Sequence, residues 1–235
     1  MTIDVTAAGR ESVALWRHVA DVAELLPGQW VLVGGLMVQL HALERGASDV
    51  RVTRDIDVLA QARPQGALAR VATALRAHGF TSEGPDLDGY AHRFVRDDLI
   101  VDVLAPDGLT PPPTLDGTQT AVGIPGGSQA LNRSAEVHVR VEDRSFVLRR
   151  PTLLGAILLK ARSLIVHADP DAQREDLLRL LALVADPRAV AADLKGGERR
   201  WLRDAESSLD SDAPSRLDVE QVRLGRLALR LLIGH

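Results

Sequence analysis

Two short segments stand out in the pattern of apolar and polar positions along the chain. The first, residues 30–33 after Gln29, is apolar and stops at Gly34 and Gly35, after which an amphipathic stretch follows. An apolar run that ends on glycines and continues with helical periodicity predicts a buried strand followed by a helix. The amino end of such a helix can bind anions. The second segment, residues 51–60, alternates polar and apolar positions and predicts a second strand.

The second strand brings two carboxylates to one place. Asp55 and Asp57 are two residues apart, and side chains two apart in a strand point to the same side of the sheet. Their Cα atoms would lie about 6.5 to 7 Å apart, so that the two carboxylates could share a divalent cation. A glycine turn for phosphate beside a twin-carboxylate strand for Mg²⁺ indicates phosphoryl or nucleotidyl transfer.

The rest of the pattern predicts an α/β (α+β) protein, with a small mixed sheet and flanking helices in residues 1–150 and a helical part in residues 151–235. We expect loops at 44–50, 81–89 and 106–117, and we assign no element to 118–133. The predicted helices cover residues 10–26, 64–78, 151–165, 170–185, short segments of 188–208, and 216–233. The further predicted strands cover residues 91–95, 99–104, 135–141 and 145–148, with hairpin turns at 96–98 and 142–143.

A third acid lies in one of these strands. Asp102 is the single charged residue of the apolar run 99–104. Because burial of an unpaired carboxylate is costly, Asp102 should meet a cation or several hydrogen-bond donors. It could complete the metal shell of Asp55 and Asp57, or accept the proton of an attacking hydroxyl. The alternative is a structural partner of a buried arginine.

Composition excludes several other chemistries. The chain of 235 residues contains no cysteine, which rules out thiol catalysis and thiolate-bound zinc. It has no apolar run near the ~20 residues that span a bilayer, so we expect a cytoplasmic protein with no membrane partner. The histidines lack metal-ligand spacing. The net charge of −4 gives no sign of nucleic acid binding.

One basic stripe remains. Arginines recur on the last predicted helix and could meet RNA phosphates, although a solvated face paired with nearby acids is the favoured interpretation. These arginines are Arg216, Arg223, Arg226 and Arg230.

The motif Gly34-Gly35 followed by Arg51-x-Thr53-x-Asp55-x-Asp57 resembles the nucleotidyltransferase superfamily that includes DNA polymerase beta, and within it the AbiEii-type branch. Members of that branch are often toxins of toxin-antitoxin pairs. The resemblance covers residues 29 to about 185 and implies a nucleoside triphosphate substrate, an RNA acceptor such as the tRNA 3′ end, and a cognate antitoxin protein. It also implies a functional lysine and aspartate on carboxy-terminal helices, which map to Lys160 and Asp176.

The residues themselves support part of this mapping. Lys160 is the only formal charge of residues 151–161, where its stem could follow apolar surface and deliver the ammonium to a triphosphate. Its alternative is a surface lysine, and that of Asp176 is a solvated acid near a helix start. Arg51 and Thr53 share the predicted face of the two acids, where they could contact phosphate, fix the carboxylates or serve the fold alone.

Our hypothesis is a Mg²⁺-dependent enzyme that moves a nucleoside monophosphate to an acceptor hydroxyl and releases pyrophosphate. Gly34 and Gly35 would admit the phosphates, the three acids would hold the metal and assist the nucleophile, and Lys160 would neutralise the triphosphate. Two alternatives stay open. One is an aminoglycoside-type nucleotidyltransferase that acts on a small molecule, and the other is a catalytically inactive module that binds a nucleotide or a partner.

Overall fold

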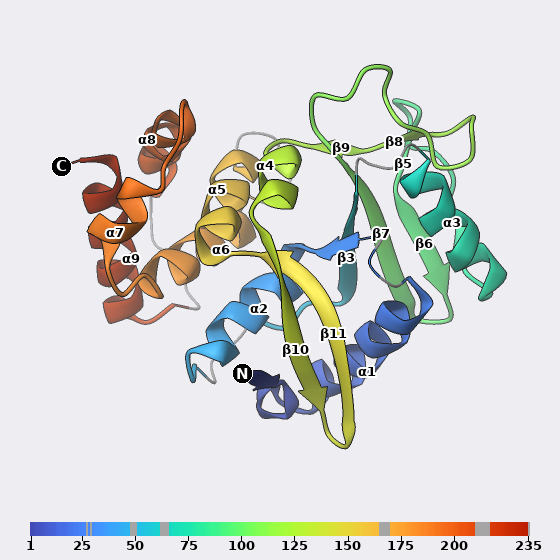
Figure 1. Ribbon diagram of the computed structural model, residues 1–235, viewed down its shortest axis with the longest axis horizontal. Coiled ribbons are helices and arrows are strands. Elements are labelled where there is room, and N and C mark those ends of the chain that lie inside the picture. The colour runs from blue at the N-terminus through green and yellow to red at the C-terminus, as the bar shows by residue number, and fades with distance from the viewer. Residues whose placement is uncertain are drawn as a thin grey trace. The chain divides into compact units, whose positions relative to one another are not determined.

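The computed structural model describes residues 1–26, 28, 30–47, 51–61, 66–164, 170–209 and 217–234 (Figure 1). It shows an α+β protein with small mixed sheets. The chain forms two compact units, Met1–Pro151 and Thr152–His235. The boundary between the units lies where the sequence pattern changes from strands to helices, at residues 151–152. In the part of the chain that the structure describes, no helix has the length and apolar character needed to cross a membrane.

The main sheet of the first unit contains the two predicted strands that carry Asp55, Asp57 and Asp102. Its strands, in spatial order, are β2 (Trp30–Leu32), β3 (Asp55–Ala60), β7 (Leu99–Pro106), β6 (Arg93–Arg96) and β4 (Thr81–Ser82), and β9 (Gly123–Ile124) also pairs with β7. β3 and β7 run parallel, whereas β2 and β6 are antiparallel to their neighbours. The sheet is therefore mixed, as the sequence predicted. Apolar side chains of β3 and β7, such as Ile56 and Val101, are fully buried.

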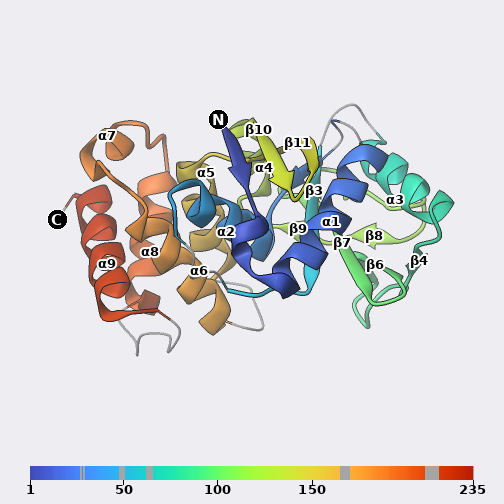
Figure 2. The ribbon, with the colours of Figure 1, turned by 90° about the horizontal axis from the view of Figure 1, so that it is seen from below.

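Besides the short helix α4 (Gly127–Asn132), the described part of this unit contains three long helices (Figure 2). They are α1 (Arg10–Leu25), α2 (Gly34–Glu44) and α3 (Ala67–Ala77). α3 packs on β3, β4 and β7, while α2 lies against β1 and β3. The sequence predicted an amphipathic helix after Gly35, but α2 is buried on nearly all sides. A buried polar chain links α2 to α1, because Trp16 Nε1 donates to Gln39 Oε1 and Gln39 Nε2 donates to Ser12 Oγ.

A second sheet adjoins the first. It consists of β1 (Thr2–Asp4), β10 (Ser134–Val141) and β11 (Arg144–Pro151). The β10–β11 hairpin confirms the sequence prediction, and its turn at Glu142 has a φ of 54°. β11 packs against both α1 and β2. A short 3-10 helix, Thr6–Ala8, connects β1 to α1.

The sequence missed the short elements between residues 81 and 133. These are β4, β5 (Tyr90–Ala91), β8 (Thr120–Ala121), β9 and α4 (Gly127–Asn132). β4 interrupts the loop expected at 81–89. Strands of two residues are too short for apolar alternation to develop, so only pairing with a neighbour defines them. β3 also begins later than predicted, at Asp55, and residues 51–54 precede it.

All the secondary-structure elements that the structure describes in the second unit are helices. Its helices are α5 (Leu153–Ser163), α6 (Pro170–Ala182), α7 (Pro187–Ala192), α8 (Glu198–Leu209) and α9 (Val219–Ile233). α9 packs against α6, α7 and α8. Its contact with α6 needs Gly225, since a Cβ there would lie 2.7 Å from the Leu178 carbonyl oxygen.

Two boundaries differ from the sequence prediction. α6 ends at Ala182, before the predicted position. The pair Asp186-Pro187 starts α7, because the Asp186 carboxylate accepts hydrogen bonds from the backbone N–H groups of Arg188 and Ala189. Other predicted positions lie outside the described residues, namely Pro27, 48–50, Pro64, Ile165, His167, Asp169 and Arg216.

Candidate active site

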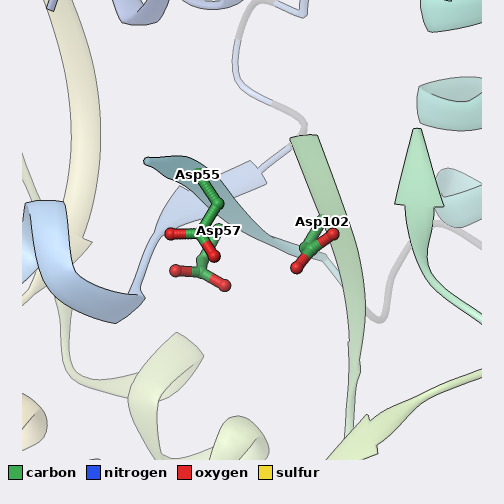
Figure 3. Close-up of side chains that lie close together, drawn as sticks. All are labelled: Asp55, Asp57 and Asp102. Atoms are coloured by element: carbon green, nitrogen blue, oxygen red, sulfur yellow. The ribbon is translucent and has the colours of Figure 1, made fainter. Parts of the chain in front are cut away.

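Three carboxylates meet on the main sheet of the first unit. Asp55 and Asp57 lie on β3, and Asp102 lies on the neighbouring strand β7, directly opposite Asp57 in the parallel register. One oxygen from each carboxylate lies within 4.8 Å of the other two. Figure 3 shows the two β3 acids next to each other and Asp102 across from them. Asp102 is buried, whereas the other two are half-buried.

The alternation of the two strands explains this convergence. Ile56 and Val101 enter the core, so the residues before and after them point to the opposite face of the sheet. Three carboxylate oxygens are hard ligands of the kind that divalent cations prefer. The group Asp55, Asp57 and Asp102 can therefore hold a metal ion.

The glycine turn lies directly against this group. Gly34 has a φ of +67°, and a Cβ at this position would lie 1.7 Å from Asp57 Oδ2. A Cβ on Gly35 would lie 3.0 Å from Arg51 Nη2 and from Thr53 Cβ. The backbone N–H of Val33 donates to the Asp57 carbonyl oxygen at 3.0 Å. The first turn of α2 thus packs on the acidic strand with no room for side chains.

Residues Arg51 and Thr53 precede β3 but remain close to the site. The Thr53 hydroxyl donates to Asp55 Oδ1 at 2.6 Å, so Thr53 fixes one carboxylate, which is one of the roles considered for it. Arg51 lies beside Gly35. Thr53 also borders a pocket of about 420 Å³ that is lined by α1 and by the β6–β7 turn.

Sequence reasoning missed one residue of the site, Arg93. Its Nε and Nη2 donate to Asp102 Oδ1 and Oδ2, each at 2.9 Å. Arg93 lies on β6 opposite Asp102 in the antiparallel register. A signal was present, because the two residues are equally far from the hairpin turn at Asp97 and Asp98. The alternative of an arginine partner for Asp102 is therefore realised, although this arginine is partly exposed and Asp102 still belongs to the acidic group.

Lys160 and Asp176 form an ion pair inside the helical unit. The Lys160 ammonium lies 2.8 Å from Asp176 Oδ2 and donates to Gln173 Oε1 at 2.9 Å. Their side chains are only 5% and 1% exposed. The alternatives of a surface lysine and a solvated acid are therefore wrong. Both residues belong to the second unit, whereas the three acids belong to the first.

The basic stripe on α9 is partly paired within the helical unit. Arg223 binds Glu220 through two hydrogen bonds, and Arg226 Nη2 donates to the Leu209 carbonyl oxygen. Arg216 lies outside the described residues. The pairing of Arg223 agrees with the interpretation of this stripe as a solvated face with nearby acids.

Comparison with known proteins adds no family to these observations. No protein-family model matches the chain, and no curated protein matches it at a significant level. The resemblance to nucleotidyltransferases therefore depends on the motif residues of the sequence alone.

Proposed function

We propose that the chain is a Mg²⁺-dependent nucleotidyltransferase with the nucleotidyltransferase fold. The observation that carries this proposal is the group of three carboxylates from two parallel strands, whose oxygens lie within 4.8 Å of one another, beside the Gly34 turn. Phosphoryl-group transfer depends on positioning and on compensation of negative charge, so a metal-binding acidic group next to a side-chain-free helix start suits it.

The reaction joins an acceptor hydroxyl to the α-phosphorus of a nucleoside triphosphate. A new oxygen–phosphorus bond forms, the bond from the α-phosphorus to the bridging oxygen breaks, and pyrophosphate leaves. Mg²⁺ bound by Asp55, Asp57 and Asp102 would supply positive charge for the phosphates. The Gly34-Gly35 turn holds the start of α2 against the Asp57 carboxylate, so its backbone N–H groups would lie beside the phosphates of a bound nucleotide. Asp102 can accept the hydroxyl proton, with its carboxylate held by Arg93.

For Lys160 we propose that its ammonium binds a phosphate group. In the helical unit, Asp176 and Gln173 hold the ammonium of Lys160 in one place. A lysine fixed in this way loses little conformational entropy when it binds a phosphate. Asp176 thus acts as the residue that orients Lys160.

The acceptor that we propose is RNA, such as the tRNA 3′ end, and the proposed partner is a cognate antitoxin protein. Both parts follow from the resemblance of Gly34-Gly35 and Arg51-x-Thr53-x-Asp55-x-Asp57 to AbiEii-type proteins. A small-molecule hydroxyl would be attacked by the same chemistry, so the experiment below includes both acceptor classes.

The test incubates the protein with α-labelled nucleoside triphosphates, Mg²⁺ and either total tRNA or aminoglycosides. We expect labelled RNA and pyrophosphate from the wild type. Asp57→Asn should reduce labelling to background, because it removes one charged metal ligand. Asp143→Asn, an exposed acid of the β10–β11 turn, should label as the wild type does.

Each other outcome has a definite meaning. Labelled aminoglycoside without labelled RNA would mean that the acceptor is a small molecule and not RNA. Nucleotide binding in calorimetry without any transfer would make the protein a binding module. Equal labelling by the wild type and Asp57→Asn would reject the metal role of the acids.

A further inference from the structure

The pair between Arg93 and Asp102 places a fixed positive charge at the edge of the acidic group. Arg93 uses its planar fork, with Nε and Nη2 each 2.9 Å from one Asp102 oxygen. The hydrogen bond to Asp102 raises the pKa of the Arg93 guanidinium, so its charge is permanent at any working pH. Only about a third of the Arg93 side chain is exposed, which reduces solvent screening of this charge.

This pairing is compatible with metal binding. The two oxygens of a carboxylate offer about four lone-pair positions. Arg93 uses one on each oxygen of Asp102, and the remaining positions can accept a cation. Arg93 does not close the site, but its charge repels any cation that enters.

Without a metal, the same charge has the opposite effect. Three carboxylates with oxygens within 4.8 Å of one another repel strongly when no cation lies between them. Arg93 compensates one of the three charges through two hydrogen bonds. It therefore stabilises the acidic group when the group holds no metal.

We propose that Arg93 is a positioning residue that sets the metal affinity of this site, as a resident counter-charge that stabilises the empty acidic group and weakens the binding of a free divalent cation. This inference depends on the proposed function only in that Asp55, Asp57 and Asp102 hold the metal. The phosphates of a nucleotide bring negative charge of their own, so a metal–polyphosphate complex offsets the repulsion by Arg93. The site is consequently tuned to take up its cation together with a polyphosphate.

The experiment measures Mn²⁺ binding to the full chain by electron paramagnetic resonance, without nucleotide. Arg93→Gln removes the charge and should tighten Mn²⁺ binding about tenfold, as expected when a unit charge beside a divalent ion is lost. Arg93→Lys keeps the charge without the fork and should bind within about twofold of the wild type, given the same Coulomb energy. Arg17→Gln breaks a similar two-bond pair with Glu142 on the surface, and it should leave Mn²⁺ affinity unchanged.

Thermal unfolding provides the second measurement. Arg93→Gln should lower the melting temperature of the metal-free protein, and added Mn²⁺ should raise it further than in the wild type. Asp57→Asn should abolish Mn²⁺ binding in the electron paramagnetic resonance titration and so locate the ion at the acidic group. Even if Arg93→Gln unfolds too easily for titration, Arg93→Lys still tests whether charge or fork geometry sets the affinity.

The outcomes separate this inference from the proposed function. Unchanged or weaker Mn²⁺ binding by Arg93→Gln overturns the role of Arg93 as a counter-charge. Mn²⁺ binding that tightens as much in Arg93→Lys as in Arg93→Gln also overturns it. Wild-type protein that binds Mn²⁺ but transfers no nucleotide contradicts the proposed function, while the ratio of the two affinities still decides the role of Arg93. Absence of Mn²⁺ binding in both the wild type and Arg93→Gln overturns both.

Discussion

Gly34 packs directly against the carboxylate of Asp57. A Cβ on Gly34 would lie 1.7 Å from Asp57 Oδ2 and 2.8 Å from Asp57 Cβ. No side chain fits in this space, and the φ of +67° independently favours glycine. The glycine turn and the acidic strand are therefore one structural unit, in which the start of α2 fixes where the Asp57 carboxylate can point.

Gly34→Ala should consequently displace the Asp57 carboxylate. We expect loss of Mn²⁺ binding and of nucleotidyl transfer, together with a lower free energy of unfolding. Gly46→Ala is the matched control, because Gly46 also has a positive φ, +76°, but a Cβ there meets nothing within 4 Å. It should cost only ~1 kcal/mol from backbone strain and keep Mn²⁺ binding. Equal Mn²⁺ titrations of the two variants would contradict a role for the contact between Gly34 and Asp57.

The hydrogen bond from Thr53 to Asp55 should matter for metal binding more than for stability. Thr53→Val keeps the shape of the side chain and removes the donor that lies 2.6 Å from Asp55 Oδ1. Because Asp55 then loses its orientation, we expect Mn²⁺ affinity to fall about tenfold, as for other partners of metal ligands. Isothermal titration calorimetry measures this change.

Thr118→Val is the control for this substitution. The Thr118 hydroxyl donates to Asp116 Oδ1 at 2.7 Å, the same local arrangement on an exposed turn. Thr118→Val should leave Mn²⁺ binding unaltered. A Thr53→Val protein with wild-type Mn²⁺ affinity would show that Asp55 needs no such support.

The buried pair of Lys160 and Asp176 should show strong energetic coupling. Removal of one partner leaves the other charge buried without compensation, so Lys160→Met or Asp176→Asn alone should cost about 3 to 5 kcal/mol. The double variant should be more stable than the sum of the single losses predicts. Urea unfolding of the four proteins gives the coupling energy, and additive losses would mean that the two charges do not stabilise each other.

Nucleotide binding by the double variant tests the other role of this pair. A protein that folds but no longer binds a nucleoside triphosphate indicates that Lys160 contacts phosphate. Wild-type affinity for the triphosphate would confine Lys160 and Asp176 to a structural role.

The sequence predicted the acidic strands and both long hairpins, because apolar alternation and turn residues define them locally. Asp102 was recognised as a buried acid for the same reason. Arg93 was missed although the predicted hairpin places it opposite Asp102, because the residues around Arg93 do not distinguish it from the other arginines of the chain. The start of β3 was placed too early because Arg51, Val52 and Thr53 alternate as a strand does, although residues 51–54 lie outside β3. The helix predicted at 170–185 extends past the end of α6 at Ala182, and Asp186-Pro187 starts the next helix.

His41 is a buried histidine that the structure holds in its neutral form. Its Nε2 lies 3.0 Å from the Pro151 carbonyl oxygen, which can only accept, so Nε2 carries the hydrogen. Nδ1 is left to accept a hydrogen bond from Arg150 Nη1. Glu44 lies 4.0 Å from Nδ1, but its carboxylate is paired with Arg150 and Arg45. Burial, and then the charge of Arg150, lowers the pKa of His41 well below its usual 6.5.

The stability of the first unit should therefore fall in mild acid. Below about pH 6.5 the His41 ring is protonated in the unfolded chain but stays neutral in the folded protein. The free energy of unfolding therefore drops as the pH decreases toward the pKa of His41 in the folded protein. The slope from this group is at most about 1.4 kcal/mol per pH unit, and the contribution is constant above pH 7. Urea unfolding at pH 7.5 and 5.5 measures the loss, which should be smaller in His41→Gln. Imidazole NMR shifts of the wild type provide an independent check, and a His41 ring that protonates near pH 6.5 in the folded protein would contradict the neutral assignment.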